Sequence, residues 1–136
     1  MRVEIGSAQL RNGFADKVAE LSGVDPMSCY QCGKCSASCP LADVMEYLPN
    51  QVIRLIQLGE EEEAIGCDSI WYCASCYTCS VRCPRDVDIA KLLEAVRQIY
   101  LRRRNQEYLK AMQLDRGELR RLPPIALVSS LRKLTA

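Results

Sequence analysis

One cysteine motif occurs twice in this chain of 136 residues and limits what the chain can fold into. The first copy runs from Cys29 to Pro40 and the second from Cys73 to Pro84, and both read C-x2-C-x2-C-x3-C-P. Eight of the nine cysteines belong to these copies. Such a density of thiols is far above that of an ordinary globular domain, so the fold must be organised around them.

The spacing within each copy is typical of ligands to a 4Fe-4S cluster. Three thiolates at intervals of three residues on a tight loop reach three corners of one cubane, while the fourth, followed by proline, ligates the other cluster. The sequence therefore predicts two 4Fe-4S clusters whose loops exchange their last ligands. The predicted ligands are Cys29, Cys32, Cys35 and Cys83 for the first cluster, and Cys73, Cys76, Cys79 and Cys39 for the second.

Zinc and disulfides are the alternatives for so many cysteines. Zinc normally takes two separated C-x2-C pairs, which differ from a run of three cysteines followed by a fourth and proline. An odd count of nine argues against complete disulfide pairing. The absence of histidine removes Rieske clusters, histidine-ligated haem and the usual catalytic zinc sites.

Charge and hydropathy limit the possible ligands of the chain and its expected compartment. The formal net charge is +1 and the basic residues are dispersed, so nucleic-acid binding is not expected. The first residues lack the apolar stretch of a secretory signal, and no apolar run reaches membrane-spanning length. We therefore expect a cytoplasmic protein without direct membrane insertion, in a compartment that keeps thiols reduced.

Periodicity predicts an all-α fold, because apolar residues recur at helical spacing and strand signals are confined to a short piece at Val3–Ile5. Residues 1–115 are expected to form the cluster-binding domain with an N-terminal helix, and residues 116–136 a C-terminal helical tail. Two roles stay open for the tail, packing on its own domain or docking on a partner protein. The predicted helices are Ser7–Leu21, Leu41–Leu48, Asn50–Leu58, a turn at Glu60–Ile65, Asp88 to about Met112, and Ile125–Leu134, around loop-like cysteine segments.

Cys67 stands outside both motifs, and its expected role is that of a buried, free, apolar side chain. No nucleophile with an adjacent base and no phosphate-binding glycine loop is present, so no catalytic residue is predicted. The chain is expected to carry electrons and to perform no bond chemistry itself.

The residues from Ser28 to about Arg103 resemble the iron-sulfur C subunit of heterodisulfide reductase. The resemblance lies in Cys-Tyr-Gln-Cys-Gly-Lys-Cys of the first motif, in Pro-Asn-Gln-Val-Ile-Arg at 49–54, and in Ile-Trp-Tyr-Cys at 70–73. It implies an α-helical ferredoxin fold, and the eight cluster ligands of the family match the eight motif cysteines. It also implies electron transfer between the flavin-containing and the catalytic, disulfide-reducing partners of the C subunit, in an oxidoreductase complex of anaerobic metabolism.

Related complexes couple the same module to hydrogenase, formate dehydrogenase or methylenetetrahydrofolate reductase subunits, and the sequence does not choose among these partners. The closest alternative is an iron-sulfur subunit of a membrane-associated respiratory oxidoreductase, which carries a related helical domain. A third possibility is a scaffold in which the clusters serve only to hold the fold together.

Overall fold

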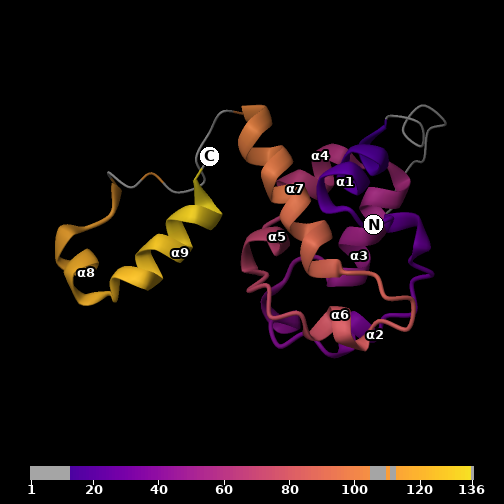
Figure 1. The fold of residues 1–136 in the computed structure, drawn as a ribbon, viewed down its shortest axis with the longest axis horizontal. Helices are drawn as coiled ribbons and strands as arrows, with labels where there is room; N and C mark the ends of the chain where they lie inside the picture. Colours follow the sequence, from indigo (N-terminus) through magenta and orange to yellow (C-terminus); the bar gives the residue numbers. More distant parts are fainter. Residues whose placement is uncertain (1–12, 105–109, 111–112, 136) are drawn as a thin grey trace. The chain divides into compact units, whose positions relative to one another are not determined.

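The computed structural model describes residues 13–104, 110 and 113–135 (Figure 1). The chain divides into two compact units, Met1–Arg97 and Gln98–Ala136. The described residues contain helices and no strand, so the predicted all-α class is confirmed. The helices of the first unit are α1 (Phe14–Ser22), η2 (Pro26–Ser28), α2 (Lys34–Ala37), η3 (Ala42–Val44), α3 (Pro49–Leu58), α4 (Glu61–Gly66), α5 (Ser69–Tyr72), α6 (Thr78–Arg82) and the start of α7 (Ile89–Arg104).

Helix α3 is delimited by local sequence signals. Pro49 occupies the first helical turn, where its missing N–H costs nothing, and the Gln51 side chain accepts a hydrogen bond from the Leu48 N–H at 2.8 Å. The helix ends at Gly59, whose φ of 74° lies in the left-handed region that glycine enters without strain. The predicted helix Asn50–Leu58, with its end at Gly59, is therefore confirmed.

The core of the first unit forms where α3 packs against α1 and α4 (Figure 1). Phe14 and Val18 of α1 and Val52, Ile53 and Ile56 of α3 are almost completely buried. Burying each such side chain contributes about 1.5–3 kcal/mol relative to its exposure. This core supports the two cysteine loops, which emerge on either side of α3 in the sequence.

The predicted helix Leu41–Leu48 is wrong over most of its length. Only η3 forms there, as a single 3-10 turn. Leu48 is extended, with φ −65° and ψ 155°, because the following Pro49 excludes the helical conformation from the residue before it. The buried Tyr47 N–H donates instead to Ser69 Oγ at 2.7 Å, which ties this segment to α5.

The cysteine segments contain more helix than expected, because α2 forms inside the predicted loop Cys29–Cys39. The turn predicted at Glu60–Ile65 is confirmed as α4. Of the predicted helix Ser7–Leu21, the described part forms α1, whereas Ser7 and the piece Val3–Ile5 lie outside the described residues. The predicted long helix from Asp88 is observed as α7 to Arg104, and Met112 lies outside the described residues.

The second unit contains α8 (Arg116–Arg121) and α9 (Pro124–Leu134), so the predicted helix Ile125–Leu134 is confirmed. Leucines of α8, of α9, of the turn between them and of the segment before α8 line a mostly apolar pocket of about 610 Å³, part of it open to solvent. The expected domain boundary between residues 115 and 116 stays a prediction. Along the described part of the chain, the helices all lack the combination of length and apolar character that crossing a membrane requires.

Candidate metal centre

The two cysteine motifs fold into two copies of the same local structure. In each copy the residue after the second cysteine is left-handed, Gly33 with φ 77° and Tyr77 with φ 59°, and a short helix follows at once. The third cysteines, Cys35 and Cys79, lie within these short helices, α2 and α6. The two helices pack side by side, so segments more than forty residues apart in sequence form one site (Figure 1).

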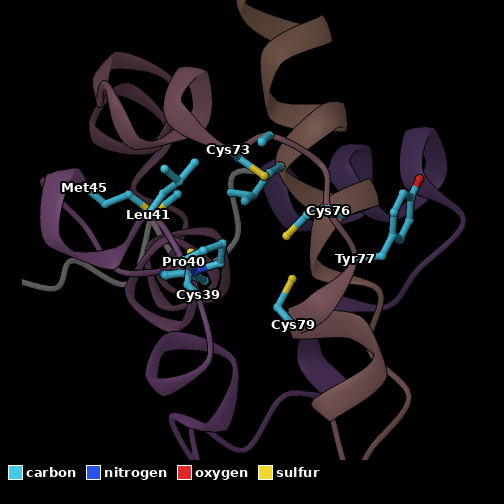
Figure 2. A pocket seen from close by; sticks show the side chains of 12 residues that line it. Cys39, Pro40, Leu41, Met45, Cys73, Cys76, Tyr77 and Cys79 are labelled. Carbon is cyan, nitrogen blue, oxygen red and sulfur yellow. The ribbon is translucent and has the colours of Figure 1, made fainter.

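One pocket is lined by cysteines from both motifs. Cys73, Cys76 and Cys79 of the second motif share it with Cys39, the last cysteine of the first motif. Figure 2 shows the sulfur atoms of the three second-motif cysteines directed into the pocket, whereas the Tyr77 ring turns outward. The space between the lining side chains is about 380 Å³, part of it open to solvent, and its other walls are apolar.

The first motif has a corresponding neighbourhood around Cys83. The Tyr30 hydroxyl hydrogen-bonds to Cys32, and this bond raises the pKa of Tyr30, with a smaller contribution from the charge of nearby Cys83. Gln31 Nε2 donates to Cys29 Sγ at 3.7 Å, and the Val87 N–H donates to Cys83 Sγ at 3.4 Å. The last cysteine of the second motif therefore lies near the loop of the first.

Hydrogen bonds favour the thiolate form of the second cysteine of each motif. The backbone N–H of Lys34 bonds to Cys32 and lowers its pKa, and the Thr78 side chain and N–H do the same for Cys76. Both donors are the first residues of α2 and α6, which the left-handed residue before them turns toward the sulfur. Such N–H···S bonds favour the negatively charged ligand that a metal cluster needs.

The third cysteines are in the opposite situation. Burial raises the pKa of Cys35 and of Cys79, so both thiols hold their protons at neutral pH without a metal. Metal binding must release these protons, which couples loading to pH and to folding.

The donor set fits an iron-sulfur cluster. All nine cysteines are free thiols, and thiolate is the ligand of such clusters. Within the described ranges, no three Cys, Asp or Glu side chains converge closely enough to hold a single metal ion. A zinc ion requires four sulfurs about 2.3 Å from one point. A cubane instead spreads its four ligands over four irons, which matches sulfurs placed around a space.

Cys67 is buried and makes no part of this arrangement. Its side chain is 3 % exposed and donates to the Ala64 carbonyl at 3.3 Å, and burial raises its pKa. The sequence-based expectation of a buried, free cysteine is confirmed.

Two serines, which the sequence pattern did not predict as functional residues, attach the cysteine loops to the longer helices after them. Ser36 Oγ donates to Asn50 Oδ1 on α3, and Ser80 Oγ donates to Asp88 Oδ1 at the start of α7, the latter at 2.8 Å. Each serine directly follows the third cysteine of its motif. This repeated position was the signal in the sequence that could have identified them.

Comparison with known proteins agrees with this geometry. Residues 27–87 match the family model described as "4Fe-4S dicluster domain". Over 78 residues, 57 % of the chain, the sequence is 42 % identical to an iron-sulfur C subunit of the CoB–CoM heterodisulfide reductase of Methanocaldococcus jannaschii, of which it covers 41 %. It is 35 % identical over 105 residues to the C2 subunit of the H2/formate:CoB–CoM heterodisulfide,ferredoxin reductase of Methanococcus maripaludis, covering 71 % of the chain and 56 % of that protein.

A further relative is the C subunit of the ferredoxin:CoB–CoM heterodisulfide reductase of Methanosarcina acetivorans, with 35 % identity over 83 residues, 61 % of the chain and 32 % of that protein. The chain spans about half the length, or less, of these curated relatives. The matched family model covers both cysteine motifs, and the relatives agree in the subunit that they name. The chain is thus similar to the iron-sulfur C subunits of heterodisulfide reductases, and its residues 27–87 match a 4Fe-4S dicluster domain.

Proposed function

We propose that this chain is a relay for single electrons that holds two 4Fe-4S clusters by crossed ligation. Cys29, Cys32, Cys35 and Cys83 would hold the first cluster, and Cys73, Cys76, Cys79 and Cys39 the second. The observation that carries the proposal is the pocket that Cys39 shares with the three second-motif cysteines (Figure 2). A ligand set confined to one motif would give Cys39 no reason to line it.

When bound, each cluster would exchange one electron at a time without making or breaking a covalent bond. The residues of the chain have three tasks in this relay. The N–H groups that open α2 and α6 favour the thiolate form of Cys32 and Cys76. The apolar pocket walls limit the access of water, and the contact of α2 with α6 keeps the two sites close enough for electron transfer between them.

We place this relay between the flavin-containing A subunit and the catalytic B subunit of a heterodisulfide-reductase-like complex in the cytoplasm. Two adjacent one-electron carriers suit the meeting of a two-electron flavin with one-electron iron-sulfur chemistry. The relatives support a place in a multisubunit reductase, because they are named as subunits of enzymes that join the heterodisulfide with hydrogen, formate or ferredoxin. The A and B subunits are the partners that the resemblance to the C subunit implies. The catalytic step would lie on the disulfide-reducing partner, and this chain would contribute conduction alone.

The test is an anaerobic native purification of the chain from its source, with mass-spectrometric identification of the proteins that accompany it. We expect a flavoprotein and a second cysteine-rich protein in fixed ratio to the chain. A parallel preparation of Cys35→Ala, which removes a proposed ligand, distinguishes partners that need the loaded site from incidental ones. Recovery with a quinone-reactive membrane protein instead would overturn the proposal in favour of a respiratory oxidoreductase.

A further inference from the structure

The loop of the first motif is fastened by a neutral side chain. Gln57, a half-buried residue on α3, donates through Nε2 to the carbonyls of Pro26 at 2.9 Å and Cys29 at 2.8 Å. Its Oε1 accepts a hydrogen bond from Gln31 Nε2 at 3.3 Å. Gln57 therefore connects Pro26, three residues before Cys29, with Gln31, the residue just before Cys32.

The loop of the second motif is fastened at the same two positions by a cation. Arg97 on α7 donates through Nη1 to the carbonyl of Ile70, and through Nη2 to Ser75 Oγ at 3.3 Å. Ile70 lies three residues before Cys73, and Ser75 directly precedes Cys76. Arg97 thus takes in the second half of the site the place that Gln57 takes in the first.

Both fastened loops contain a conformation that needs support. Gln31 has φ 63° and Ser75 has φ 53°, in the left-handed region that side chains other than glycine rarely adopt. Such a conformation costs on the order of 1 kcal/mol or more and persists only where the surroundings impose it. Gln57 is hydrogen-bonded to Gln31, and Arg97 is hydrogen-bonded to Ser75. Both side chains therefore help to hold their loops in this conformation.

Gln57 and Arg97, the two anchors of the cysteine loops, differ in charge and burial. Arg97 carries a guanidinium cation, and its side chain is 1 % exposed. Its ion-pair partner, Glu94, is 43 % exposed, so water screens the negative charge more than the positive one. The cation next to Gln57 is Arg54, whose Nη1 lies 3.4 Å from Gln57 Oε1 but which is exposed.

The other cations beside proposed ligands are also in solvent, namely Lys34, Arg82 and Arg85. Their fields are weakened by water and by salt. In the described part of the first unit, Arg97 is a fully buried cation, and it bonds to the loop of the second motif.

We infer that Arg97 is a positioning residue that shapes the second cysteine loop and raises the reduction potential of the cluster held there. The inference rests on the proposed function. Reduction adds one electron, supplied in the test by dithionite, and takes the cluster with its four thiolates from a net charge of about −2 to about −3. Arg97 bonds to Ser75, the residue before Cys76, and stabilises the more negative state because its own guanidinium is buried and its charge is weakly screened by water.

The test is a redox titration of the anaerobic, fully loaded chain, followed by electron paramagnetic resonance. Arg97→Gln gives the second cysteine loop a glutamine like Gln57 at the first loop, and it removes the charge. We expect the potential of one cluster to fall by the equivalent of about tenfold in its reduction equilibrium, which is about 59 mV for a one-electron couple. The other potential stays constant. Arg97→Lys keeps the charge, so both potentials stay near their starting values.

Two controls separate an effect of charge from an effect of structure. Glu94→Gln removes the counter-charge and keeps an oxygen acceptor, so it should shift the same potential upward. Arg54→Gln removes the exposed cation beside Gln57 and should move neither potential by a comparable amount. In a Cys32→Ala background, which leaves the second loop complete, the shift caused by Arg97→Gln should remain.

The inference is overturned if Arg97→Gln leaves both potentials in place, or if it and Glu94→Gln shift a potential in the same direction. If Arg97→Gln fails to load, the absence of an upward shift in Glu94→Gln overturns it equally. An unmodified chain without two one-electron 4Fe-4S signals would instead overturn the proposed function, and the inference with it.

Discussion

At the scale of single residues, the conformation of the backbone favours the thiolate form of the second cysteine of each motif. Gly33 and Tyr77 are both left-handed, and each turns the chain so that the next N–H reaches the preceding cysteine. Glycine adopts this conformation freely, whereas tyrosine does so at a cost. The repeat in the sequence predicted equivalent loops, but it could not predict this shared dihedral angle because the two residue types differ.

The first prediction concerns Gly33. Gly33→Ala should destabilise the loaded protein by about 1–2 kcal/mol, because a Cβ is disfavoured at φ 77° even though no atom within 4 Å would contact it. The control is Gly66→Ala, where a Cβ also meets nothing within 4 Å and φ is not positive, and it should be neutral or slightly stabilising. The midpoint of cluster loss in guanidinium chloride, measured anaerobically, compares the two. Equal midpoints would show that the left-handed turn is not needed.

The second prediction concerns Cys67. Cys67→Ala should retain the full iron content, because the thiol is buried and bonded to the Ala64 carbonyl, apart from the pocket. We expect a loss of about 1 kcal/mol in stability from the small void and the missing hydrogen bond. Iron analysis beside thermal denaturation checks both parts. A loss of about four irons would identify Cys67 as a ligand and contradict the assignment.

At the scale of elements, the contact between α2 and α6 brings two segments that are distant in the sequence into one site. Hydrophobic spacing predicted α3, α7 and α9 because long amphipathic helices are marked by many residues at once. It failed at Leu41–Leu48, where apolar spacing was present but Pro49 and the bond from Tyr47 to Ser69 favour another conformation. The short helices α2 and α6 carry too few residues for a periodic signal.

The third prediction tests the exchange of ligands between the two loops. The double variant Cys39→Ala/Cys76→Ala removes two ligands of the same cluster if the ligation is crossed. It should therefore keep about four irons and the full spectrum of one intact cluster. The matched variant Cys39→Ala/Cys32→Ala removes one ligand from each cluster and should perturb both signals.

Uncrossed ligation, in which each motif holds its own cluster, predicts the reverse for the two variants. An intact cluster in Cys39→Ala/Cys32→Ala together with two damaged ones in Cys39→Ala/Cys76→Ala would therefore reject the proposed ligand sets. Iron content and electron paramagnetic resonance, measured on the same samples, supply the comparison.

At the scale of the whole molecule, the class of cofactor could be predicted from the spacing of the motif cysteines, because the motif is short, repeated and chemically specific. The anchors could not, since Gln57 and Arg97 lie far from the motifs in sequence and become equivalent only through the contacts they make. The two cysteine loops thus share one local structure, but the buried cation Arg97 lies at the second loop. In the proposed relay, this difference would give the two sites unequal reduction potentials.

The central claim is that the chain holds two 4Fe-4S clusters, and the most direct measurement is the iron, acid-labile sulfide and zinc content of anaerobically purified protein. The account predicts about eight irons and about eight sulfides per chain, with little zinc. A preparation dominated by zinc without sulfide, or one that holds only about four irons after complete reconstitution, would contradict it.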